Sequence, residues 1–150
     1  MLTPEEFAVL IDGEGCINSE VMTCGEPYPR VWVGNTDPIY PKILHEQFGG
    51  CLRLEKKEGE QKDMWKWCVT GKACEKVLIF VLPVIRMKKL QAEAALLMAS
   101  TIAEYRGSRR KLTTRDKLIR WRMHELLHQL NRRGKPAKEE VDEVVQELEE

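Results

Sequence analysis

Two acidic residues stand at the end of an apolar segment near the start of the chain. Residues 7–11 are apolar, and Asp12 and Glu14 follow them, alternating with Gly13 and Gly15. The C-terminal end of a helix dipole disfavours negative charge, so carboxylates there need a compensating cation. Hard carboxylate and carbonyl oxygens suit Mg²⁺, and glycine lets backbone approach closely because it has no Cβ. The segment is therefore either a magnesium site or a plain Asx-Gly turn after a core helix.

A second pattern with possible chemistry is His124-Glu-Leu-Leu-His128. It matches H-E-x-x-H, the signature of zinc metalloproteases, and places both histidines on one helical face. Glu143 or Glu147 would be the third ligand. The match is isolated and lies among basic residues, and its apolar neighbours already explain a packed amphipathic helix. We therefore favour the structural interpretation and keep a zinc peptidase as a third hypothesis.

The formal net charge of zero conceals a strong asymmetry. Residues 106–138 carry 12 basic and two acidic residues, residues 139–150 carry seven acidic and no basic ones, and the preceding 105 residues are nearly balanced. A concentrated basic block favours a polyanionic partner, usually nucleic acid. The alternative is a solvated basic helix that pairs with the acidic terminal segment.

Composition restricts the class of protein. A chain of 150 residues that is 43% hydrophobic and 32% charged fits one ordinary domain and excludes a disordered or collagen-like protein. The longest apolar run, Val77–Ile85, is too short for a membrane helix and contains Pro83. We expect no secretory signal, because the first residues show no basic stretch followed by an apolar core. The five cysteines form no CxxC pair, which indicates reduced thiols. We expect a cytoplasmic protein of a bacterial or phage-type host with no membrane partner.

Hydrophobic periodicity predicts two β-hairpins with helices between them. Thr3-Pro4-Glu5-Glu6 is a capping box with proline at the first helical position. Clustered hairpins with intervening helices indicate an α+β fold, with helices on one face of an antiparallel sheet. A domain of residues 1–106 and a helical extension of residues 107–150 are expected. The predicted strands are Cys16–Thr23, Arg30–Gly34, Leu52–Lys57 and Trp65–Val69, and the predicted helices are 4–11, 36–48, Gly71–Leu82, Lys88–Tyr105, Thr114–Arg133 and Pro136–Leu148.

Alternation along the strands assigns the two faces of the sheet. The inward set, expected beneath the helices, is Ile17, Val21, Val31, Val33, Leu52, Leu54, Trp65 and Trp67. The outward set mixes hydrogen-bonding, charged and aromatic groups suited to base edges in a major groove, with the two arginines as candidates for guanine contacts. Its members are Asn18, Glu20, Met22, Arg30, Trp32, Arg53, Glu55, Lys57 and Lys66. Arg109, Arg110 and Lys111 are candidates for phosphate contacts, which add affinity without sequence information.

The segment Phe-Ala-Val-Leu-Ile-Asp-Gly-Glu-Gly resembles the LAGLIDADG motif of homing endonucleases. Val33–Asp37, Phe48–Gly50 and Trp67–Gly71 follow in the order and spacing of that family, as does Pro83 with Lys88 and Gln91-Ala92. The resemblance spans roughly residues 4–105, and the joint match is far more specific than the motif alone. It implies an αββαββα core with a four-stranded antiparallel DNA-binding sheet in each subunit.

The resemblance also implies roles for individual residues. Glu14 would bind the metal by its carboxylate and Gly13 by its carbonyl, with Mg²⁺ as cofactor and Mn²⁺ or Ca²⁺ as substitutes. Lys88 would be the active-site lysine, and Asn35 would position water. A single motif implies a homodimer in which the motif helix packs on its copy. The implied interface is Phe7, Ala8, Val9, Ile11 and Asp12, with Asp12 also capping and orienting the helix end.

The sequence thus predicts a homodimeric, metal-dependent endonuclease that cuts double-stranded DNA at a long, near-palindromic site. Val9 departs from the small residue usual at its motif position, and its bulk is expected to widen the helix crossing. The leading alternative is a protein of this fold that binds DNA, or assists RNA splicing, without cleavage, because fold does not fix activity.

Overall fold

The computed structural model describes residues 1–23, 25–103, 113–132, 142 and 146. The described part is an α+β layer structure, as predicted, with a four-stranded antiparallel sheet. No helix in it is long and apolar enough to cross a membrane. The elements in chain order are α1 (Pro4–Glu14), β1 (Gly15–Val21), β2 (Pro27–Asn35), α2 (Ile39–Phe48), β3 (Cys51–Glu55), β4 (Met64–Val69), α3 (Gly71–Val81), α4 (Lys89–Ala103) and α5 (Thr114–Leu130).

The capping box at the start of α1 is confirmed in both directions. The Glu6 amide donates to Thr3 Oγ1 at 3.2 Å, and the Thr3 amide donates to Glu6 Oε2 at 2.9 Å. Phe7 then enters an aromatic cluster with Phe48 and Trp67, whose ring centroids lie 5.1 and 5.9 Å from its own. The cap sets where the helix begins, and Phe7 fixes which side of it faces the core.

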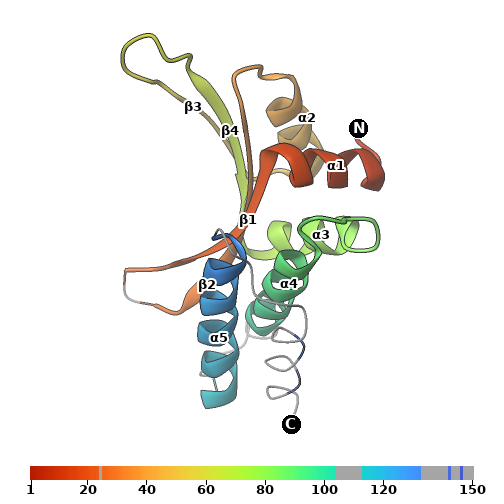
Figure 1. The fold of residues 1–150 in the computed structure, drawn as a ribbon, viewed down its shortest axis with the longest axis vertical. Coiled ribbons are helices and arrows are strands. Elements are labelled where there is room, and N and C mark those ends of the chain that lie inside the picture. Colours follow the sequence, from red (N-terminus) through yellow and green to blue (C-terminus); the bar gives the residue numbers. More distant parts are fainter. Residues whose placement is uncertain (24, 104–112, 133–141, 143–145, 147–150) are drawn as a thin grey trace.

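The sheet has the strand order β1-β2-β4-β3. Both of its hairpins extend beyond the helices, toward the left in Figure 1. The predicted turn between the first two strands was too long, because β2 already begins at Pro27. Pro27 and Pro29 pair with β1, whereas β4 pairs only with residues 31–35 of β2. Proline has no amide proton to donate, and it is tolerated in residues 27–30 because that part of β2 has no described partner strand on the side away from β1.

The core lies between the inward face of the sheet and the helices. Ile17, Val31, Val33 and Trp67 are fully buried there, as predicted. The prediction of burial is wrong for two members of the inward set, because Val21 is 44% exposed and Leu54 is 40% exposed. Both lie toward the hairpin tips, which extend past the helices and leave their inward side uncovered (Figure 1).

Helix α5 packs into the same core as the rest of the chain. Met123, Leu127 and Leu130 are at most 1% exposed within the common hydrophobic cluster. Arg120 is also buried, and its Nε donates to Thr101 Oγ1 of α4 at 2.9 Å. The predicted boundary between residues 106 and 107 lies outside the described residues, as does nearly all of the predicted helix 136–148.

Candidate active site and nucleic-acid interface

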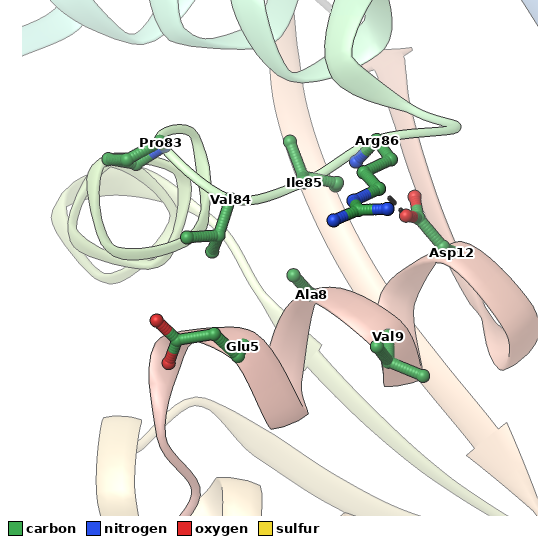
Figure 2. Close-up of a pocket in the computed structure, with 8 residues that line it drawn as sticks. All are labelled: Glu5, Ala8, Val9, Asp12, Pro83, Val84, Ile85 and Arg86. Carbon is green, nitrogen blue, oxygen red and sulfur yellow. Dashed lines mark hydrogen bonds between the residues drawn. The ribbon is translucent and has the colours of Figure 1, made fainter.

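Asp12 connects the end of α1 to the beginning of α4. Its carboxylate accepts hydrogen bonds from the amides of Arg86 and Met87, both at 3.1 Å, and of Lys88 at 3.0 Å. Figure 2 shows Asp12 pointing across at Arg86. An anion at a helix N-terminus satisfies free amides and opposes the helix dipole. The helix end that Asp12 caps is therefore that of α4 and not that of its own helix.

Lys88 makes the reverse connection. Its Nζ donates to the carbonyls of Ile11 at 2.7 Å, Asp12 at 3.1 Å and Gly15 at 2.6 Å, at the C-terminal end of α1. A cation there stabilises the negative end of the helix dipole. A Cβ on Gly15 would lie 2.8 Å from Ile11 Cα, so glycine is required where the chain turns into β1. The ammonium is thereby fixed beside the last residues of the motif helix.

Glu14 contrasts with both of these residues. It is exposed, and within the described part of the chain its carboxylate has no hydrogen bond or ion pair. Gly13 is exposed as well, and its carbonyl lies in the last turn of α1, where the helical ladder supplies no donor. The described residues contain no group of three His, Cys, Asp or Glu side chains able to hold a metal. The described residues of one chain therefore offer two exposed oxygen donors here and no complete metal site.

Asn35 ends β2 next to the point where β1 begins, because Gly15 pairs with Val33. Its Oδ1 accepts a hydrogen bond from the Asp37 amide at 3.0 Å, an Asx turn that leads into α2. Asp37 Oδ1 in turn accepts from the Ile39 amide at 2.9 Å. These bonds orient the Asn35 side chain by its oxygen and leave the amide nitrogen as its remaining polar group.

The outer face of α1 is a ridge between two grooves. Val9 forms its crest and is 74% exposed. A groove of about 460 Å³ lies between α1 and residues 83–86, with Ala8, Val9 and Asp12 on the helix side (Figure 2). A second groove of about 660 Å³ lies on the other flank and includes Leu10, Glu14 and Tyr40. The exposed surface of α1 is thus continuous from the ridge to Glu14.

The predicted dimer interface is wrong at two of its residues. Phe7 and Ile11 are 0% exposed because they form part of the core cluster of their own chain. They are unable to contact a second copy in this conformation. Ala8 is 2% exposed at the floor of the groove beside residues 83–86, and Val9 is the motif residue that projects outward.

The outward face of β1 and β2 carries a linked set of polar side chains. Arg30 forms an ion pair with Glu20 and donates from Nε to Asn18 Oδ1 at 3.4 Å. The Tyr28 hydroxyl donates to Glu20 at 3.0 Å, and burial together with this bond raises the pKa of Tyr28. Sequence reasoning missed Tyr28 because the neighbouring prolines indicated a turn. Its spacing of two residues from Arg30 and four from Trp32 was the available signal.

The outward face of β3 and β4 has a carboxylate at its centre. Glu55 lies 3.1 Å from Arg53, 3.7 Å from Lys57 and 3.8 Å from Lys66. Lys66 Nζ also lies 4.2 Å from the centre of the Trp32 ring, a cation–π contact that joins this cluster to β2. Arg53 and Lys66 are direct cross-strand partners, so Glu55 relieves the repulsion between two like charges.

The predicted outward set therefore shares one face, with two members beyond the strand ends. Met22 follows β1 and is 58% exposed, and Lys57 follows β3, where its amide donates to Asp63 Oδ1 at 3.0 Å. Four cations and two carboxylates make the charge of this set positive. Arg109, Arg110 and Lys111 lie outside the described residues.

His124 and His128 lie one turn apart on α5, with ring centroids 4.5 Å apart. His124 Nδ1 is 2.6 Å from Ser19 Oγ of β1. Burial lowers the pKa of His124, and His128 lowers it further, while Glu125 acts in the opposite direction. Glu143 and Glu147 lie outside the described residues, and the described part offers no third ligand. Nothing here favours the zinc peptidase over the packed-helix interpretation.

The structure resembles solved homing endonucleases over nearly its whole length. I-CvuI in complex with its target in the presence of Ca is 18% identical, with a TM-score of 0.63 over 97% of this chain and 94% of that one. The archaeal intron-encoded I-Vdi141I complexed with DNA is 14% identical, with a TM-score of 0.64 over 97% and 96%. I-TnaI is 17% identical, with a TM-score of 0.58 over 98% of both chains. No protein-family model and no curated protein matches the sequence.

These comparisons define the class of fold: the chain has the fold of the LAGLIDADG homing endonucleases. The extent of each match differs with the length of the neighbour. The match to the I-SmaMI LAGLIDADG homing endonuclease bound to cleaved DNA includes 97% of this chain but only 49% of that one, at a TM-score of 0.52 and 17% identity. The chain thus corresponds to nearly the whole of the shorter proteins and to about half of the longer one.

Proposed function

We propose that this protein is a site-specific endonuclease that binds duplex DNA as a homodimer and hydrolyses phosphodiesters with the help of a divalent metal. The observation that carries the proposal is the end of α1. There the exposed Glu14 carboxylate, which has no hydrogen bond or ion pair within the described part of the chain, belongs to the same helix end as the Lys88 ammonium, which three carbonyls fix. A carboxylate and a fixed cation at one helix end suit the binding of a metal and a phosphate.

The donor set at this position fits a hard divalent cation. The Glu14 carboxylate and the Gly13 carbonyl are the oxygen ligands that Mg²⁺ prefers, and Mg²⁺ usually keeps only one or two protein carboxylates. When bound, such an ion stabilises charge on the attacking and leaving oxygens. Lys88 places a fixed positive charge near the developing negative charge, and the Asn35 amide nitrogen is available to orient water.

The outer face of α1 supports assembly with a second copy. Val9 is largely exposed, and a Cβ placed on Gly13 would meet nothing within 4 Å among the described residues. Packing within that part of the chain therefore does not explain a glycine there, whereas close approach of a second α1 would. A two-fold contact along this ridge would bring two Glu14 carboxylates together and complete the site.

The outward face of the sheet supports DNA as the substrate. It carries Arg30, Arg53 and Lys66 together with Asn18 and Trp32. Arginine can read guanine by paired hydrogen bonds, and asparagine can read adenine in the same way. I-CvuI and I-Vdi141I are described in complex with DNA, and I-CvuI in the presence of Ca or Mg.

Selection of cleaved sites from a randomised plasmid library in Mg²⁺ tests the function. On a selected site, Glu14→Gln should reduce cleavage at least 1,000-fold, on the order expected for an essential charged group. DNA binding should change less than about threefold, because the volume of the side chain is kept. Glu46→Gln, at an exposed position of α2, is the matched control and should cut like the parent.

Two results would contradict this assignment. Full cleavage by the Glu14→Gln protein would remove Glu14 from the active site. A parent that binds a defined duplex tightly but cuts no member of the library in Mg²⁺ or Mn²⁺ would support the non-cutting alternative, for which the bulk of Val9 at the helix ridge is the relevant observation.

A further inference from the structure

The histidine pair of α5 takes no part in the proposed nuclease chemistry. His128 is exposed, His124 is half-buried, and both line a groove of about 350 Å³ with Glu125, Gln129 and Arg132. The positions i and i+4 place both imidazoles on one side of the helix, and their centroids lie 4.5 Å apart. This spacing suits two rings that share one ion ~2.0–2.1 Å from a nitrogen of each.

We propose that His124 and His128 form a binding site for one divalent transition-metal ion of the Zn²⁺, Ni²⁺ or Cu²⁺ class. Imidazole nitrogen is a preferred ligand for these ions and a poor one for Mg²⁺. The site is therefore chemically distinct from the oxygen donors at Glu14. It does not depend on the proposed nuclease function.

Ser19 orients one of the two imidazole rings by a hydrogen bond to its second nitrogen. Its side chain is buried on the inward face of β1, and its hydroxyl lies 2.6 Å from His124 Nδ1. When Nδ1–H donates to that hydroxyl, the Nε2 lone pair is free for a metal. Metal-binding histidines usually hold their second nitrogen in this way, which fixes the tautomer and the orientation of the ring.

The charges around the groove set the strength of binding. Glu125 attracts a cation and Arg132 repels it, and both line the groove, so the two charges oppose one another. The affinity therefore comes chiefly from the two nitrogens, with water in the remaining positions. His124 also contacts β1, and Asn131 donates to the Ile17 carbonyl at 3.0 Å, so the end of α5 that carries the two histidines is already held against the sheet.

Isothermal titration of the metal-free full-length protein with ZnCl₂, repeated with NiCl₂, tests the site. We expect one ion per chain and a rise in the thermal midpoint, because a ligand that binds only the folded state stabilises it. His128→Asn should weaken binding at least tenfold, as should His124→Asn. Ser19→Ala should weaken it about tenfold through loss of the orienting bond. His45→Asn, which removes the remaining histidine of the chain, should bind like the parent.

His128 is exposed, so its replacement leaves the fold intact and the test stays decisive even if His124→Asn is unstable. Stoichiometric zinc retained by His128→Asn would overturn the proposal and point to thiols, of which Cys51 and Cys68 are cross-strand partners. Absence of binding by the parent up to millimolar zinc would overturn it as well. Neither outcome bears on DNA cleavage in Mg²⁺.

Discussion

Asp12 shows how one side chain joins parts of the chain that are far apart in sequence. It accepts amide protons from residues 74 to 76 positions away, while its own carbonyl accepts from Lys88 Nζ. Asp12 of α1 thus stabilises the start of α4, and Lys88 at the start of α4 stabilises the end of α1. In the proposed function, metal binding falls to Glu14, two residues further on. The acidic pair of the motif would then divide into a structural member and a metal-binding one.

Replacing Asp12 by alanine should lower the free energy of unfolding by about 2 kcal/mol, because three amides at the start of α4 lose their acceptor. Urea denaturation followed by circular dichroism measures the change. Asp37→Ala is the matched control, since Asp37 accepts one exposed amide at the start of α2 and should cost less than about 1 kcal/mol. Equal losses for the two variants would contradict the double role of Asp12.

The single helix α1 presents two different surfaces, and only the structure separates them. Phe7 and Ile11 face the core, and Val9 faces outward between two grooves. The position for testing self-association is therefore Val9. A charge at Ala8 would enter a covered site and damage the fold first, because Ala8 is 2% exposed.

If the proposed homodimer forms along this ridge, Val9→Glu should raise its dissociation constant at least 100-fold. An unpaired carboxylate buried between two helices costs about 3 kcal/mol or more. Analytical ultracentrifugation measures the change, and DNA cleavage should be lost with the dimer. Leu118→Glu, at a 51% exposed position of α5, controls for adding a charge to an exposed apolar site. A Val9→Glu protein that remains as dimeric as the parent would exclude this ridge as the interface.

Local signals account for what the sequence predicted well at this scale. The capping box set the start of α1, and alternation assigned Asn18, Arg30 and Lys66 to one face of the sheet. Such local signals could not predict contacts between residues that are far apart in the sequence. The hydrogen bond between Ser19 and His124 spans 105 positions, and although alternation places Ser19 on the inward face with Ile17, it does not indicate which residue of a distant helix the hydroxyl meets. The burial of Phe7 and Ile11 likewise depends on which side of α1 meets the aromatic cluster.

At the scale of the whole molecule, α5 completes the core that the first hundred residues begin. Met123, Leu127 and Leu130 belong to that core, and each such side chain contributes about 1.5–3 kcal/mol when buried. A chain that stops at residue 106 should therefore lose most of a typical stability of about 5–15 kcal/mol. Its thermal unfolding, measured by calorimetry, should show no cooperative transition. A cooperative transition near that of the parent would make α5 dispensable.

The basic block is better tested by substitution than by truncation, because truncation also removes α5. Changing Arg109, Arg110 and Lys111 to glutamine should weaken binding to all duplexes alike. The slope of log K against log salt should flatten by about 0.9 for each phosphate that the variant no longer neutralises. Changing Lys72, Lys76 and Lys89 on the helical side is the matched control and should leave the slope as it is. An unchanged slope in the first variant would assign these residues to a role other than binding phosphate.

The crossed pair of caps at Asp12 and Lys88 has a kinetic consequence. The amides of residues 86–88 are bonded to a residue of α1 and not to their own helix, so they exchange with deuterated solvent only when that junction opens. Opening the junction also releases the ammonium of Lys88 from the end of α1. The deuterium uptake of these three amides therefore reports how often the junction beside Glu14 is dismantled, in a protein free of both DNA and metal.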